Sequence, residues 1–155
     1  MSRKSVFVKV SGNMCKSEKF IAALEKLSRD FFVVICVGGG TQINRALAKV
    51  GVPKIPHGPL GRELPNFKLR QLARDVLEQN QADLQDVLAK NKIQATVIIP
   101  VLDIGSVLCH VNGDKFLETA YLGFDQLYVV TTPSRVSKKE KQFAHLPKIK
   151  VLSFK

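Results

Sequence analysis

Three consecutive glycines, Gly38, Gly39 and Gly40, follow a run of seven apolar residues in the segment 31–44, FFVVICVGGGTQIN. The apolar run predicts a strand that is buried on both faces of a sheet. Thr41 is expected to cap a helix that follows, so that backbone N–H groups of the glycine turn point outward at a helix N-terminus. This geometry suits phosphate or carboxylate, although the segment is neither a GxGxxG fingerprint nor a P-loop.

A second segment, Lys9-Val10-Ser11-Gly12, ends the first predicted strand, residues 5–10. If this strand and the strand before the glycines are parallel neighbours, Ser11 and Gly12 form a turn beside the triple glycine. A lysine in that place could neutralise the charge of a phosphoryl group during transfer. The alternative interpretation is a lysine that reaches solvent at the end of a strand.

A third segment, His110-Val111-Asn112-Gly113-Asp114, lies between a predicted strand and a predicted helix. Asn112 or Asp114 could cap this helix, which is a sufficient local reason for either residue. The functional interpretation makes Asp114 an acid that orients lysines or holds a metal-bound nucleotide.

Hydrophobic periodicity predicts the elements that must position these residues. Strands are expected at residues 5–10, 31–37, 94–102, 106–110, 126–131 and 149–154. Helices are expected after Ser17, from Thr41 to about Val50, and at residues 113–123 and 136–145. Residues 66–91 predict one long helix, or two with a break near Asn80, and the Pro- and Gly-rich residues 51–65 predict a long loop.

Alternating strands and helices predict an α/β protein, a three-layer α/β/α sandwich with a mainly parallel sheet. The length of 155 residues fits a single domain, residues 1–155. Such folds bind ligands beyond the carboxyl ends of their strands, where the glycine turn is expected.

Composition and sequence patterns predict the cellular compartment of the protein. No apolar run approaches the roughly 20 residues of a membrane span, and the N-terminal residues do not resemble a signal peptide. The three cysteines form no CxxC pair, and Cys36 and Cys109 stand in apolar strands, which is typical of buried thiols in a reducing compartment. A catalytic Cys15 is disfavoured because no base is visibly arranged for it. These features predict a cytoplasmic protein without a membrane partner.

The net charge of +11 leaves several partners open. Residues 132–155 hold seven Lys and Arg residues and one acid, Glu140, and therefore contribute +6. A solvated basic face, an anionic metabolite and nucleic acid are all compatible with this distribution. Nucleic acid is the least favoured, because the chain has no Trp, 7% aromatic residues and no RRM, KH or zinc pattern.

The three segments occur in the order typical of the amino-acid kinase family. Lys-x-Ser-Gly after the first strand, Gly-Gly-Gly followed by Ile-Asn, and Asn-x-Asp before a helix and the strand ending Val-Val-Thr resemble that family from Val6 to about Val136. VGGGTQIN is similar to the acetylglutamate kinases, and VKVSG is similar to the uridylate kinases. The resemblance implies a shortened member of an ATP-dependent phosphotransferase family.

The resemblance also implies roles for individual residues. Lys9 would stabilise the transferring phosphoryl group, and Asp114 would organise the catalytic lysines. Arg62, which follows Gly61, would hold a substrate carboxylate. The phosphoryl group and the acceptor would contact the residues of the turns, namely Ser11, Gly12, Gly38, Gly39, Gly40 and Asn112.

The chain departs from the family at several positions. His110 replaces a substrate-binding asparagine, which argues against acetylglutamate itself as the acceptor. The family's nucleotide half follows a Thr/Ser-Asp-x-x-Gly-Val segment and supplies a second lysine, whereas residues 131–136 here read TTPSRV. Residues 1–130 are therefore expected to form the acceptor-side lobe and residues 131–155 a remnant of the nucleotide side. The short interval 95–112 predicts the loss of a strand and a hairpin.

Three functions follow as hypotheses. The first is ATP-dependent phosphorylation of a small carboxylate or phosphate acceptor, with Mg²⁺ and ATP as cofactors and nucleotide contacts from Thr131, Thr132 and Arg135. The second is a non-catalytic nucleotide- or anion-binding protein or regulatory subunit. The third is a nucleic-acid binder. The resemblance further implies a homodimer through the helix at residues 66–91, whose alternative is an ordinary covering helix, and no residues are assigned as metal ligands.

Overall fold

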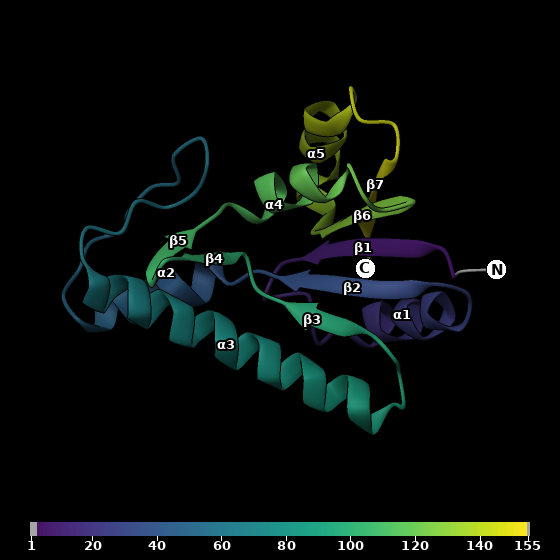
Figure 1. Cartoon of the computed structure of the whole chain (residues 1–155), viewed down its shortest axis with the longest axis horizontal. Coiled ribbons are helices and arrows are strands. Elements are labelled where there is room, and N and C mark those ends of the chain that lie inside the picture. Colours follow the sequence, from purple (N-terminus) through teal and green to yellow (C-terminus); the bar gives the residue numbers. More distant parts are fainter. Residues whose placement is uncertain (1–2, 155) are drawn as a thin grey trace.

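The computed structural model describes residues 3–154. Five strands form one fully parallel sheet in the order β3-β2-β1-β6-β7 (Figure 1). They are β1 (Ser5–Val10), β2 (Phe32–Val37), β3 (Thr96–Ile98), β6 (Gln126–Thr131) and β7 (Ile149–Ser153). Val10 lies opposite both Val37 and Val130, so the central strands end level with one another at a common carboxyl edge.

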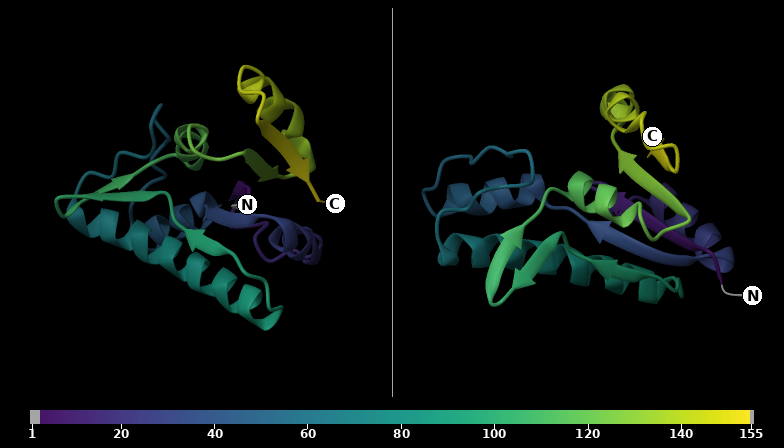
Figure 2. Two further views of the ribbon diagram at one scale, coloured as in Figure 1. Left: turned by 45° about the vertical axis from the view of Figure 1, so that its right-hand side comes forward. Right: turned by 45° about the horizontal axis from the view of Figure 1, so that its top comes forward.

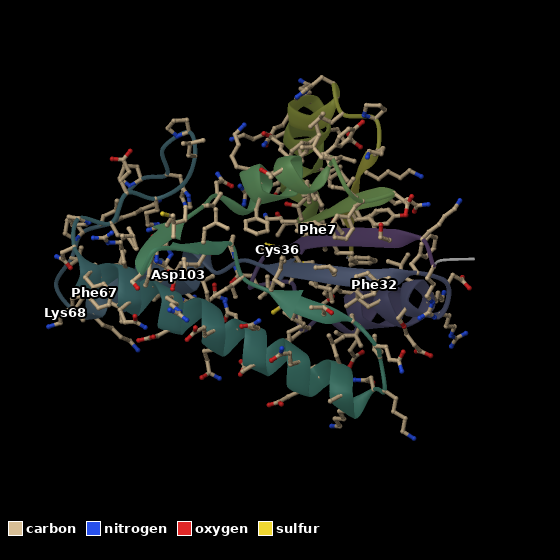
Figure 3. All side chains as sticks on the ribbon, viewed as in Figure 1. Phe7, Phe32, Cys36, Phe67, Lys68 and Asp103 are labelled. Carbon is tan, nitrogen blue, oxygen red and sulfur yellow. The ribbon has the colours of Figure 1, made fainter. Side chains whose placement is uncertain are left out.

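Helices cover both faces of this sheet. The helices α1 (Glu18–Asp30) and α3 (Phe67–Lys90) lie on one face, and α4 (Gly113–Ala120) and α5 (Val136–Phe143) lie on the other (Figure 1). Alternate side chains of a strand point to opposite faces, so Val6 and Val8 pack under α1, whereas Phe7 packs under α4. Figure 3 places Phe7 and Cys36 on the α4 side of the sheet. The expected three-layer α/β/α sandwich is confirmed.

Local sequence explains where the helices begin. Ser17 caps α1 by accepting a hydrogen bond from Phe20 N at 3.2 Å, and Asn66 caps α3 by accepting one from Leu69 N at 3.0 Å. The helix α3 is continuous, which confirms one long helix and excludes the alternative of two helices with a break near Asn80. None of the described helices combines the length and the apolar character that a membrane crossing requires.

The helix α2 (Gly40–Lys49) starts differently from the prediction. Its N-cap is Gly39, and the cap residue makes no side-chain hydrogen bond. Thr41 lies in the first turn, where its hydroxyl accepts a hydrogen bond from Asn13 Nδ2 at 3.2 Å. The prediction that Thr41 caps the helix was therefore wrong. The helix packs on α3 at the carboxyl edge of the sheet.

The predicted strand at residues 94–102 is two separate elements. After β3 the chain bends at Pro100, and β4 (Val101–Ile104) pairs antiparallel with β5 (Val107–His110). Proline has no N–H to continue the ladder, which accounts for the break. This hairpin stands away from the main sheet and packs on α3 (Figure 2). The expected loss of a hairpin from this interval was wrong.

The apolar side of α3 is used inside the chain itself. Leu69, Ala73, Leu77, Leu84 and Leu88 are all buried against the sheet, α2 or the following loop, whereas Ala82 is exposed. The stripe therefore identifies a covering helix. Association through this helix gains no support from it, and the homodimer stays a prediction.

Replacing Leu84 tests this packing. Leu84 is 0% exposed, and Leu84→Ala is expected to lower the free energy of unfolding by about 2 to 5 kcal/mol because a cavity opens between α3 and the sheet. Leu122 is 90% exposed, and Leu122→Ala is expected to change it by less than about 0.5 kcal/mol. Urea unfolding of both variants measures the difference, and equal effects would contradict the packing.

Candidate functional site

A cavity of about 460 Å³ opens at the carboxyl edge of the sheet. It lies where the strand order reverses, since the chain continues from β1 to β2 and β3 on one side and from β6 to β7 on the other. Ligands of open α/β sheets bind at such switch points. All twelve predicted site residues line this cavity: Lys9, Ser11, Gly12, Gly38, Gly39, Gly40, Arg62, Asn112, Asp114, Thr131, Thr132 and Arg135.

The two glycine turns lie against each other as the sequence predicted. Gly38 N donates a hydrogen bond to Val10 O at 2.8 Å. A Cβ atom on Gly12 would lie 2.7 Å from Gly38 O, and one on Gly39 would lie 2.9 Å from Leu77 Cδ2. Neither glycine has a positive φ, so close approach of the backbones is the reason for glycine at these two positions.

Asn80 of α3 fixes this pair of turns from below. Its Nδ2 donates a hydrogen bond to Gly38 O at 3.0 Å, and the same atom lies close to the Cβ positions of Gly12 and Gly39. The residue suggested from sequence as a helix break is thus a support for the glycine turn.

Asp114 lies between two lysines. Its Oδ1 is 3.4 Å from Lys9 Nζ, and its Oδ2 accepts a hydrogen bond from Lys139 Nζ. Gln142 bridges the second pair, because its Oε1 accepts from Lys139 Nζ at 2.9 Å and its Nε2 donates to Asp114 Oδ2 at 3.3 Å. Asn112 caps α4 by accepting from Asp114 N at 2.9 Å, which sets the carboxylate at the start of that helix.

Burial and charge compete in this cluster. Burial raises the pKa of Asp114. Lys9 and Lys139 lower this pKa by more than burial raises it, so the pKa of Asp114 lies below its ordinary value. Burial lowers the pKa of Lys139, and contact with Asp114 only partly offsets that loss. The Asp114 carboxylate is therefore ionised at neutral pH. It pairs with the ammonium groups of Lys9 and Lys139 in a largely buried environment.

Sequence reasoning did not single out Lys139. It is 5% exposed and lies four residues before Phe143, which is 2% exposed, so both side chains project from the buried face of α5. The Nζ atom lies 5.9 Å from the centre of the Phe143 ring. A lysine in helical register with a buried aromatic residue was the available signal.

The proline-rich loop brings Arg62 to the opposite side of the cavity. Gly61 pairs with Val111, and a Cβ atom there would lie 2.0 Å from His110 O, so only glycine allows the approach. Asn112 N donates to Leu60 O at 2.7 Å, and Arg62 N donates to His110 O at 3.3 Å. These bonds join the loop to the segment that carries Asp114.

Arg62 is 7% exposed, and its hydrogen-bond partners are uncharged. Its Nη1 donates to Asn44 Oδ1 at 2.5 Å, and its Nη2 donates to His57 Nε2 at 3.1 Å. Burial, and then the charge of Arg62, lower the pKa of His57, which keeps its ring neutral and able to accept this bond. His57 is a cavity residue that sequence reasoning missed, because the loop that carries it has no periodic pattern.

His110, which replaces the family's asparagine, also lines the cavity. Its Nε2 donates to Arg70 O at 2.9 Å, so this nitrogen is occupied by the backbone of α3. Burial is the main cause that lowers the pKa of His110. The ring is thereby fixed at the cavity wall in its neutral form.

The lining is strongly cationic. Among the described residues, the lining holds five basic side chains and one acid, Asp114, so its net charge is +4 if both histidines are neutral. The basic residues are Lys9, Arg62, Arg135, Lys138 and Lys139. Thr131, at the end of β6, and Thr132 adjoin the short 3₁₀ turn Pro133–Arg135 on this side. Within residues 3–154 no group of three or more His, Cys, Asp or Glu residues could hold a metal ion.

Comparison of the sequence with protein-family models and with curated proteins finds no match. The likeness to amino-acid kinases therefore remains a resemblance of motifs.

Removing the Asp114 charge tests the cluster. Asp114→Asn leaves Lys9 and Lys139 without a counter-charge, and we expect a loss of about 3 to 5 kcal/mol in the free energy of unfolding at pH 7. The folded-state pKa of Asp114 is depressed, so the stability it contributes is full above its ordinary pKa and is lost as the pH falls through the folded value.

The difference between the wild type and Asp114→Asn should therefore shrink as the pH is lowered from about 5 to 2. Urea unfolding across this range measures it. Asp86→Asn, an exposed position on α3, is the matched control. A difference that is independent of pH would contradict the assigned ionisation.

Proposed function

We propose that this protein transfers a phosphoryl group from ATP to a small anionic acceptor. The observation that carries the proposal is the position of Asp114 between Lys9 and Lys139 at the edge of the cavity formed by the two glycine turns. Two cations held side by side can stabilise the negative charge on the oxygens of a phosphoryl group in transfer.

The reaction needs little covalent help from the protein. A carboxylate or phosphate oxygen of the acceptor attacks the γ-phosphorus of ATP, a new P–O bond forms, and the bond to the bridging oxygen breaks. ADP leaves with the electron pair of that bond, and no proton is transferred. Lys9 and Lys139 would contact the transferring group, while Gly12, Gly38 and Gly39 let it approach the backbone.

The nucleotide would lie on the α5 side of the cavity. Thr131, Thr132, Arg135 and Lys138 line that side and offer hydroxyl and cationic partners for the phosphates of ATP. Asp114 is the only acid of the lining and is already paired with two lysines, so Mg²⁺ would be held chiefly by the phosphates. Lys139 would take the role of the second lysine of the amino-acid kinases.

The lysines give a direct test. Lys9→Met and Lys139→Met are each expected to lower ATP-dependent phosphorylation of an acceptor at least about 100-fold, because each removes a cation from the transferring group. Lys141→Met, at an exposed position of α5 outside the cavity, should retain wild-type turnover. A panel of carboxylate and phosphate acceptors with MgATP, assayed by ADP release, measures all three.

Isothermal titration of the wild type with MgATP provides the second readout. Binding at millimolar nucleotide is expected, and the absence of heat at that concentration would contradict a kinase. Retained turnover in Lys139→Met would show that this lysine does not contact the transferring group.

A second function has one observation in its favour. The described residues that line the cavity include no Phe, Tyr or Trp, and its two imidazoles, His57 and His110, are held by Arg62 and by Arg70 O, so the cavity offers little stacking surface for an adenine base. This favours the alternative of a non-catalytic protein that binds a phosphate- or carboxylate-bearing metabolite, as a regulatory subunit would. Nucleic acid is less well supported, because the cations converge on a cavity of about 460 Å³.

Ligand-induced thermal shifts separate the two functions. A non-catalytic binder should show a raised melting temperature with inorganic phosphate or simple carboxylates, no ADP release, and a shift that largely survives Lys9→Ala. The absence of any shift across the anion panel would argue against both functions.

The cytoplasm is the proposed location. ATP is available there, and the three cysteines, Cys15, Cys36 and Cys109, are free thiols in the structure. Burial raises the pKa of Cys36 to about 12, so this thiol is unreactive and serves the core.

A further inference from the structure

Part of the cavity has an apolar floor. Ile43, Leu64, Ala73 and Leu77 line it and belong to one buried cluster between α2, α3 and the proline-rich loop, and Pro100 closes it from the sheet side. A polar sugar or amino-acid body would leave its hydroxyl or amino groups without partners against these side chains.

This floor is continuous with the glycine turn. The Cβ position of Gly39 lies 2.9 Å from Leu77 Cδ2, and the Cβ position of Gly40 lies 3.9 Å from His57 Nε2. The glycine turn therefore adjoins both the apolar floor, at Leu77, and His57, the hydrogen-bond partner of Arg62.

Arg62 lies beside His57 in the lining of the same cavity. It is 7% exposed, and none of the ion pairs within residues 3–154 includes it. Its neutral partners, Asn44 and His57, orient the guanidinium but do not compensate its charge. A buried cation without a counter-ion is costly, and an anionic group of a ligand would compensate it.

Resting on the proposed phosphoryl transfer, we propose that the acceptor is a short amphipathic anion. Its anionic head, a carboxylate or a phosphate, pairs with Arg62 beside His57. Its apolar body of a few carbons lies on Ile43, Leu64, Ala73 and Leu77, and an oxygen nucleophile at its other end reaches Lys9 and the glycine turn. The cavity therefore selects the acceptor by its apolar body as well as by its charge.

Two dicarboxylates of equal length and charge test the floor. Adipate and glucarate both have six carbons and two carboxylates, but adipate has four methylenes where glucarate has four hydroxyl-bearing carbons. Burial of one methylene is worth about fourfold in affinity, so adipate is expected to bind the wild type at least about tenfold more tightly. Isothermal titration without ATP measures both dissociation constants.

The head is tested with variants and with a second probe. Arg62→Met should raise the dissociation constant of adipate at least about tenfold, whereas Arg45→Met, at an exposed position of α2, should leave it unchanged. Butyl phosphate and valerate carry the same butyl chain, so the tighter of the two identifies the preferred head. Circular dichroism and melting temperature confirm that both variants fold.

The outcomes separate this inference from the kinase proposal. Equal or tighter binding of glucarate, or adipate binding that is unchanged in Arg62→Met, would overturn the amphipathic acceptor even if lysine-dependent ATP turnover is found. Preference for adipate with loss in Arg62→Met supports it, even if no acceptor is phosphorylated and the kinase proposal fails.

Discussion

The carboxylate of Asp114 holds together two cations that would otherwise repel each other. Lys9 comes from the central strand β1 and Lys139 from α5, and both ammonium groups are partly withdrawn from water at the carboxyl edge of the sheet. Their proximity is tolerable only because a negative charge is shared between them, and Gln142 hydrogen-bonds to both Lys139 and Asp114 Oδ2. The position of α5 relative to β1, and hence the shape of the cavity, depends on this contact.

The remaining parts of the cavity are built around that fixed point by close backbone packing. Gly12 and Gly39 allow two turns to meet where side chains would collide, and Gly61 allows the proline-rich loop to reach the segment that carries Asp114. Asn112 thus joins α4 to the proline-rich loop. Its side chain caps α4, and its backbone N–H donates a hydrogen bond to Leu60 O in the loop. A shift of the loop would move Arg62 and the start of α4 together.

The cavity combines two chemistries that rarely lie so close. One half is polar and cationic, with the lysines and the backbone of the turns, and the other is an apolar floor that ends at a buried guanidinium. Under the proposed function, the first half would hold a group that carries several negative charges, and the second would select the molecule that receives it.

The sequence alone determined the features that depend on neighbouring residues. Apolar runs and alternation predicted β1, β2 and β6, Ser17 and Asn66 marked two helix starts, and consecutive glycines after a buried strand predicted the turn at the cavity. Tertiary structure alone decided the contacts between residues far apart in the chain. Lys139 and Asp114 are 25 positions apart, and Asn80 and Gly38 are 42 apart, so no local pattern relates them. His57 meets Arg62 only because the loop folds back on α2, and the hairpin of β4 and β5 leaves the sheet because Pro100 interrupts the ladder. Backbone preferences act over a few residues, whereas the site is assembled by packing across the whole sheet.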